Sequence, residues 1–106
     1  MSKTWKNIER KIASFFGSER TPLSGGNSKI TRSDSLHALL FVETKYRKQH
    51  SAVSLWRKTK DLADKENKLP VVCLSEKGKP GFWVVCHSKD LTAIANQRAI
   101  AKRGEL

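Results

Sequence analysis

The sequence predicts an α/β domain in which helices flank a central mixed β-sheet. Three observations lead to this fold class. Apolar residues recur at three- and four-residue steps in three segments, short apolar runs have the length of β-strands, and the two kinds of segment alternate along the chain. At 106 residues the chain fits one hydrophobic core. We therefore expect a single domain over residues 1–106, ordered helix, loop, strand, helix, strand, strand, helix.

The first segment, residues 4–16, is typical of an amphipathic helix. Its apolar positions follow helical spacing with lysines between them: Trp5, Ile8, Ile12, Phe15 and Phe16. Gly17 is expected to end this helix. Residues 17–35 are rich in Gly, Ser, Thr, Arg and Lys without an apolar period, which predicts an exposed, mobile basic loop suited to contacting phosphates.

The next segment is predicted to be a strand that ends in charged residues. Residues 39–42 are apolar and Glu43-Thr44-Lys45 follows them directly. Alternation along a strand places Phe41, Glu43 and Lys45 on one face. We expect a short additional strand near Asp34 to precede this one.

The second half of the chain predicts a helix, a hairpin and a final helix. Residues 51–66 carry apolar residues at helical spacing, and the apolar runs 69–74 and 82–86 are separated by a Gly- and Pro-containing turn. Ser88 is a candidate N-cap for the last helix, and residues 101–106 are expected to form its frayed end.

The chain is strongly basic, and this favours a polyanionic partner. Lys and Arg number 21 against 10 Asp and Glu, which gives a net charge of +11. Nucleic acid is the leading candidate, because neutralising phosphates releases condensed counterions, while anionic membrane surfaces and mere solubility are the alternatives. No apolar run approaches the roughly 18 residues of a membrane span and no signal peptide is recognisable, so we expect a cytoplasmic protein.

The two cysteines, Cys73 and Cys86, lie in apolar strand-like runs, and their separation matches no zinc-ligand spacing. We interpret both as reduced core residues. Trp56 and Trp83 are likewise predicted to be core residues rather than platforms for base stacking.

Asp34 and the Glu43-Thr44-Lys45 sequence carry the candidate chemistry. Hydrolysis of a phosphodiester needs a divalent cation, and Mg²⁺ prefers carboxylate oxygens while it keeps several waters. Asp34 and Glu43 can supply such oxygens, and the backbone carbonyl of Thr44 is a further candidate ligand. Lys45, roughly 6–7 Å along the strand from Glu43, can contact the same water or phosphate oxygen.

Glu9 supplies a third acid from the first helix. It falls within roughly 40° of Trp5 around the helix axis, so its carboxylate points with the apolar face. A carboxylate directed inward usually meets a cation or a donor. Glu9 is therefore a candidate metal ligand, either directly or through bound water.

These motifs resemble the archaeal-type Holliday-junction resolvases and their small phage relatives, in the PD-(D/E)xK nuclease superfamily. The resemblance covers residues 5 to about 88 and rests on Glu9-Arg10, Ser24-Gly25-Gly26 in the basic loop, Asp34, and Phe41-Val42-Glu43-Thr44-Lys45. The following helix and strand pair are in the order of that family.

This resemblance implies a restriction-endonuclease-like core and a homodimer that binds branched DNA, holds one metal site per subunit and makes paired nicks. The functional residues would be Glu9, Asp34, Glu43 and Lys45, with Ser24 contacting DNA near the cut. Mg²⁺ is the implied cofactor and Mn²⁺ its alternative. If the gene belongs to a phage, the implied location is the host cytoplasm.

Two features depart from the family pattern. Ser33 stands before Asp34 where proline is usual, and the interval from Asp34 to Glu43 is shorter than in the archaeal enzymes. The hairpin that connects them must therefore be tight, which bears on junction specificity more than on cleavage.

Ser24 and seven cationic or aromatic residues are expected to contact the DNA. The seven are Arg10, Arg20, Lys29, Arg32, Tyr46, Arg47 and Lys48. The three histidines lack metal-ligand spacing, which favours structural or surface roles for them, although His50 lies near enough to the predicted strand to be an outside candidate for contacting substrate.

Alternatives stay open for each acid. Asp34 is also suited to capping a turn, Glu43 and Lys45 to a surface ion pair, and Glu9 to pairing with a neighbouring lysine. For the whole chain, one alternative is a non-catalytic, architectural DNA-binding protein, and another is a nuclease of the same class that acts on nicks, flaps or single strands.

Overall fold

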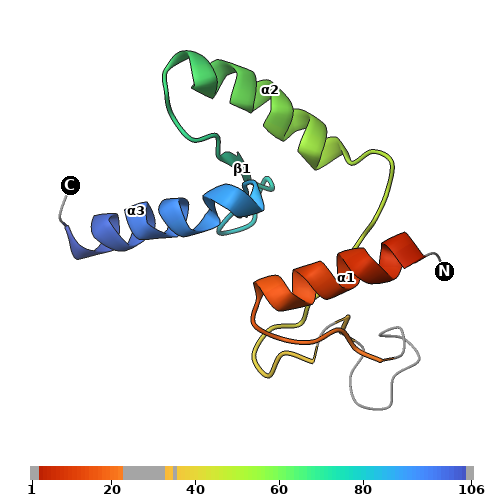
Figure 1. Cartoon of the computed structure of the whole chain (residues 1–106). Helices are drawn as coiled ribbons and strands as arrows, with labels where there is room; N and C mark the ends of the chain where they lie inside the picture. The colour runs from red at the N-terminus through yellow and green to blue at the C-terminus, as the bar shows by residue number, and fades with distance from the viewer. Residues whose placement is uncertain (1–2, 23–32, 35, 105–106) are drawn as a thin grey trace. The chain divides into compact units, whose positions relative to one another are not determined.

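The computed structural model describes residues 3–22, 33–34 and 36–104. The chain divides into two compact units, Met1–Lys48 (unit 1) and Gln49–Leu106 (unit 2), and each is described by itself. Figure 1 shows helix α1 in unit 1, and helices α2 and α3 with a small sheet in unit 2.

Unit 1 begins with helix α1, Lys3–Phe15, which confirms the helix predicted over residues 4–16 to within a residue at each end. Its inward face includes Ala13, which is 1% exposed, and Glu9, which is 3% exposed. The helical phase that placed Glu9 with the apolar residues is therefore confirmed. A carboxylate occupies the most buried face of this helix.

Helix α1 ends at the predicted glycine. The N–H of Gly17 donates to the carbonyl of Ser14 and the N–H of Ser18 donates to the carbonyl of Ala13, both at 2.9 Å. This pair of bonds is the Schellman arrangement, which satisfies carbonyls left over at a helix end. It needs a left-handed residue, and Gly17 has φ of +72°.

After α1, three short stretches of unit 1 are joined by backbone hydrogen bonds. The N–H of Thr21 donates to the carbonyl of Asp34 at 3.1 Å, and the N–H of Leu36 donates to the carbonyl of Glu19 at 2.9 Å. The N–H of Asp34 in turn donates to the carbonyl of Val42 at 2.7 Å. Asp34 is thereby held between a stretch on either side of it.

The strand predicted over residues 39–45 is wrong, because this segment forms no regular strand. Side chains take the backbone groups that a ladder would use. The hydroxyl of Ser33 accepts from the N–H of Val42 at 2.7 Å and donates to its carbonyl at 3.0 Å. The Nδ1 atom of His37 accepts from the N–H groups of residues 39 and 40.

The predicted alternation of side chains in this segment nevertheless holds. Phe41, Glu43 and Lys45 are exposed, whereas Val42 is half-buried and Thr44 is buried. The face that carries Glu43 and Lys45 is therefore a solvent face.

Unit 2 contains helix α2, Ser51–Lys65, as predicted over residues 51–66. Trp56 on this helix is 8% exposed and belongs to the core, as expected. Strands β1, Val72–Leu74, and β2, Trp83–Val85, pair antiparallel as the predicted hairpin. Both strands are shorter than their apolar runs.

The end of unit 2 is helix α3, Leu91–Arg103, entered through a 3₁₀ turn, η2, at Ser88–Asp90. The prediction of Ser88 as N-cap is wrong. The N-cap of α3 is Asp90, which makes no capping hydrogen bond with its side chain, and the turn before it is capped by His87, whose Nδ1 accepts from a backbone N–H at 3.1 Å. Gly104 closes α3 in a left-handed conformation, with φ of +76°.

Within the described residues the sheet has two strands, so the central mixed sheet expected from the sequence is not among them. Trp83 is 55% exposed and Cys73 is also exposed, which corrects their prediction as core residues. Two strands alone cannot bury both of their faces. Both cysteines are free thiols, and Cys86 is half-buried.

The single domain over residues 1–106 stays a prediction. The tail expected over residues 101–106 is helical as far as Arg103, and residues 105–106 lie outside the described part. Within the described ranges, no helix combines the length and apolar character that crossing a membrane requires.

Candidate functional site

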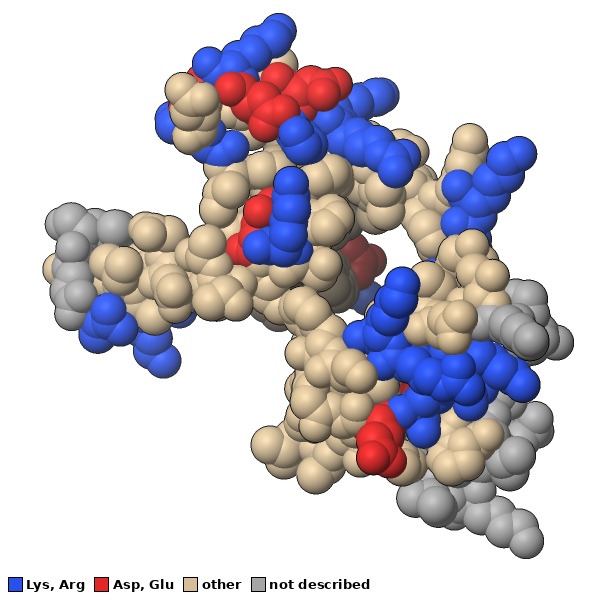
Figure 2. Space-filling model, in the orientation of Figure 1, with Lys and Arg blue, Asp and Glu red and all other residues tan. Residues whose placement is uncertain are grey.

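The basic composition is visible on the surface. On the face drawn in Figure 2, Lys and Arg side chains cover much more area than Asp and Glu side chains do. Any acid that is buried in this chain is therefore an exception, and it calls for a physical explanation.

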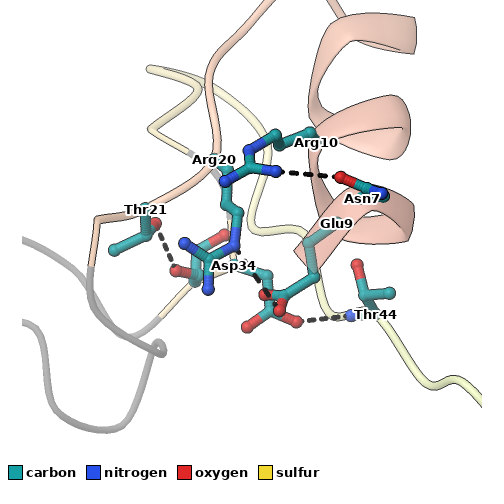
Figure 3. Close-up of polar contacts among 8 residues, drawn as sticks. Asn7, Glu9, Arg10, Arg20, Thr21, Asp34 and Thr44 are labelled. Atoms are coloured by element: carbon teal, nitrogen blue, oxygen red, sulfur yellow. Dashed lines mark hydrogen bonds and ion pairs between the residues drawn. The ribbon is translucent and has the colours of Figure 1, made fainter. Parts of the chain in front are cut away.

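Two described acids are buried, Glu9 in unit 1 and Asp90 in unit 2, and Glu9 is the one that belongs to the predicted site. Its carboxylate projects from α1 toward Arg20, and the Oε1 atom of Glu9 lies 3.6 Å from Nε of Arg20 (Figure 3). The Arg20 side chain is 12% exposed, so both charges are largely removed from water. The alternative that Glu9 pairs with a neighbouring lysine is thus replaced by an arginine from the stretch that follows the helix.

Asp34 is held by bonds to other stretches of unit 1. Its Oδ2 atom accepts from the N–H of Thr44 at 2.6 Å, which is a short, charge-assisted hydrogen bond (Figure 3). One residue earlier, the carbonyl of Ser33 accepts from the hydroxyl of Thr21 at 2.8 Å. These bonds fix the backbone on which Asp34 sits, and in the view of Figure 3 its carboxylate overlaps that of Glu9 beside Arg20.

Three buried polar atoms of unit 1 lack a hydrogen bond within the described residues. Two of them, Oε1 of Glu9 and Nε of Arg20, face each other at 3.6 Å as the ion pair. The third, Oγ1 of Thr44, has no partner among the described residues, which costs roughly 1–3 kcal/mol. Two carboxylates and a hydroxyl are hard oxygen donors, so their chemistry fits a hard divalent cation or a bound water.

Glu43 and Lys45 are not drawn into this cluster. Their side chains are about half exposed, and Oε1 of Glu43 lies 3.0 Å from Nζ of Lys45. Among the described residues, no three His, Cys, Asp or Glu side chains are grouped so that they could hold a metal. The structure thus pairs Glu9 with Arg20 and Asp34 with the amide of Thr44, and leaves the Glu-x-Lys pair on the solvent face.

The predicted DNA contacts of unit 1 fall into two groups. Arg10 and Arg20 line one cavity of about 320 Å³ together with two serines, and Arg10 donates to the side-chain carbonyl of Asn7 at 2.9 Å. Tyr46, Arg47 and Lys48 are exposed. The predictions for Ser24, Lys29 and Arg32 lie outside the described residues.

Sequence reasoning assigned Arg20 to phosphate binding and missed its pairing with Glu9. The signal available was a buried helical acid followed, after the turn at Gly17, by an arginine within reach. The hydroxyls of Thr21 and Ser33, which hold the backbone around Asp34, gave no signal by spacing.

Away from this cluster, Lys60 on α2 shows the clearest electrostatic effect. Its hydrogen bond to Asp64, at 2.6 Å, and then the negative charge of that carboxylate raise the pKa of Lys60. This is a surface pair within one helix and is unrelated to the acids of unit 1.

Comparison with known proteins adds no family assignment. No protein-family model, no curated protein and no solved structure matches this chain.

Proposed function

We propose that this chain is a Mg²⁺-dependent, structure-selective DNA endonuclease of the PD-(D/E)xK type that resolves Holliday junctions by paired nicks. The observation that supports it best is the pair Glu9 and Asp34, whose carboxylates overlap beside Arg20 in the view of Figure 3, within a chain of net charge +11. A protein that must bind polyanions gains nothing from buried acids unless they serve another purpose.

In this proposal Glu9 and Asp34 hold the cation, and Glu43 and the carbonyl of Thr44 are the further ligands. Glu43 directly precedes the amide that binds Asp34, but its side chain lies on the solvent face, so its ligation requires this segment to turn. A bound Mg²⁺ would polarise the scissile phosphate and lower the pKa of an attacking water.

The chain's own residues supply the rest. Lys45 would orient that water or stabilise charge on the phosphorane, which is an electrostatic role. Its present partner is Glu43, and because both side chains are about half exposed, their ion pair is worth only about 0–1 kcal/mol. A phosphate can therefore replace Glu43 at little cost.

The proposal includes a restriction-endonuclease-like fold, a homodimer and a location in the cytoplasm, or in the host cytoplasm for a phage protein. The fold rests on the resemblance alone, since the described stretches that follow α1 are joined by hydrogen bonds but form no regular strand.

A second candidate is a non-catalytic, basic DNA-binding protein. The specific observation in its favour is that Glu43 and Lys45 neutralise each other at the surface, and that the described residues contain no group of three potential metal ligands. This candidate predicts DNA binding that is independent of Mg²⁺.

The test is cleavage of end-labelled four-way, flap, nicked and linear DNA, with and without Mg²⁺, followed on denaturing gels. Asp34→Asn removes one charge but keeps an oxygen to accept from the N–H of Thr44, and Glu43→Gln is equally conservative. Asp61→Asn on α2 is the matched control, because it removes the charge of an exposed acid.

The proposal expects symmetric nicks in the four-way junction, lost in Asp34→Asn and Glu43→Gln and kept in Asp61→Asn, while all variants still bind DNA. Cleavage of flaps, nicks or single strands alone would keep the enzyme and change its substrate. Binding without cleavage by the wild-type protein at any Mg²⁺ concentration would favour the second candidate instead.

A further inference from the structure

Unit 2 contains a cavity of about 330 Å³ between the first turns of α2 and the chain that leaves β2. Its walls combine apolar, aromatic and polar side chains: Val53, Trp56, Arg57, Val85, His87 and Ser88. This volume is in the range of small-ligand sites, and the mixture of a few polar groups with apolar walls is typical of them.

Trp56 lines this cavity and carries a buried donor without a partner among the described residues. Its side chain is 8% exposed, and its Nε1–H group is buried with no partner within the described residues. An indole N–H can only donate. A buried donor of this kind usually has a partner, so an acceptor that is not part of the described chain is expected beside Trp56.

His87 contributes a second donor. Its Nδ1 atom already accepts from the N–H of Lys89, at 3.1 Å, so in the neutral ring the proton sits on Nε2. The imidazole also lies against Trp56, with ring centroids 5.5 Å apart. The two rings are tilted by 42° against each other, and His87 offers a donor at this wall.

The charges of the walls point to an anion. Arg57 carries a guanidinium suited to bidentate contact with an oxyanion, and the hydroxyl of Ser88 can donate as well. None of the described residues that line the cavity is Asp or Glu. Asp90, two residues after Ser88, is buried but does not line it.

We propose that this cavity binds the terminal phosphate of a nucleotide, with Arg57 and His87 donating to the phosphate oxygens and Trp56 and the valines contacting the sugar or base. The shared chemistry is a phosphate monoester on a small organic body, and its source is either a free nucleotide or the 5′ end of a strand. This site belongs to unit 2 and does not depend on the nuclease proposal.

The experiment titrates the full chain, without divalent cations and at about 0.15 M salt to screen surface charge. The probes are thymidine 5′-monophosphate, thymidine, inorganic phosphate, and a short oligothymidylate with and without a 5′-phosphate. The readout is the indole N–H signal of Trp56 in two-dimensional NMR, assigned by its loss in Trp56→Phe.

The decisive variants are Arg57→Gln and Lys58→Gln. They remove the same charge from adjacent exposed positions of α2, but only Arg57 lines the cavity. We expect thymidine 5′-monophosphate to shift the Trp56 signal, thymidine to leave it in place, and Arg57→Gln to weaken binding roughly tenfold or more, as loss of a charge-assisted contact does. Lys58→Gln should stay within about twofold of the wild type, because screened surface charges interact weakly.

The remaining outcomes identify the source of the phosphate or overturn the assignment. Binding of the 5′-phosphorylated oligothymidylate but not its unphosphorylated form supports a strand end as the source, whereas tighter binding of the mononucleotide supports a free nucleotide. Inorganic phosphate binding as tightly as the nucleotide would overturn the assignment. So would an unmoved Trp56 signal, or equal effects of Arg57→Gln and Lys58→Gln. Because no cleavage is measured, failure of the nuclease proposal leaves these outcomes intact.

Discussion

The buried pair of Glu9 and Arg20 should be strongly coupled in stability. At 3.6 Å and an effective dielectric constant of about 20, attraction between the two charges is roughly 4–5 kcal/mol. Removing both groups from water offsets most of this. The net coupling should then be about 1–3 kcal/mol.

A double-mutant cycle measures this coupling. Glu9→Gln, Arg20→Gln and the double variant are compared with the wild type by urea unfolding followed by circular dichroism. Each single variant leaves one buried charge without its counter-charge. The losses of unfolding free energy in the two single variants should therefore sum to more than the loss in the double variant. A matched cycle on the exposed pair Glu66 and Lys68, whose side chains are more than half exposed, should show coupling near zero.

The reasoning is refuted if the Glu9 and Arg20 effects simply add. Additivity would mean that the two side chains are hydrated independently and that Glu9 does not share a buried space with Arg20.

Three further predictions concern local geometry. Thr44→Val should leave stability unchanged or raise it by up to about 1 kcal/mol in urea unfolding, because the Thr44 hydroxyl is buried without a partner while the N–H that binds Asp34 is kept; a loss above 1 kcal/mol would contradict this. Gly17→Ala should cost about 1–2 kcal/mol, since φ is +72° there, and an unchanged midpoint would argue against the Schellman end of α1. Cys73 should react with a maleimide faster than Cys86 does, by peptide mass mapping, because it is the more exposed thiol; equal rates would contradict the hairpin.

Helices could be predicted from the sequence because their signals are local. The apolar period of residues 4–16 fixed both the extent of α1 and the inward direction of Glu9, and both are confirmed. Gly17 marked the helix end for a physical reason that holds in any context, since only glycine enters the left-handed region without strain.

The strand over residues 39–45 could not be predicted correctly, because its backbone is bound by side chains that lie outside the segment. An apolar run has the composition of a strand, but the Ser33 hydroxyl and the His37 ring occupy the backbone groups a ladder needs. Exposed Trp83 has a similar origin. Its strand pattern is correct, and what the pattern cannot reveal is whether another layer covers it.

The candidate site was predicted in part. The inward direction of Glu9 followed from helical phase, whereas the meeting of Asp34 with the amide of Thr44 follows from the way the chain folds back after α1. Alternation placed Glu43 and Thr44 on opposite faces, as observed. It could not tell which of the two faces is buried, and the structure buries Thr44.

The most direct test of the account is whether a divalent cation binds between Glu9 and Asp34. Substoichiometric Mn²⁺, added to the full chain and followed by paramagnetic broadening of backbone amide signals, answers it without any substrate. We predict selective broadening of Asp34, Thr44 and the turn of α1 around Glu9, reversed by excess Mg²⁺ and lost in Asp34→Asn. Broadening confined to exposed acids such as Asp61, or uniform across the chain, would contradict a cation site between these two carboxylates.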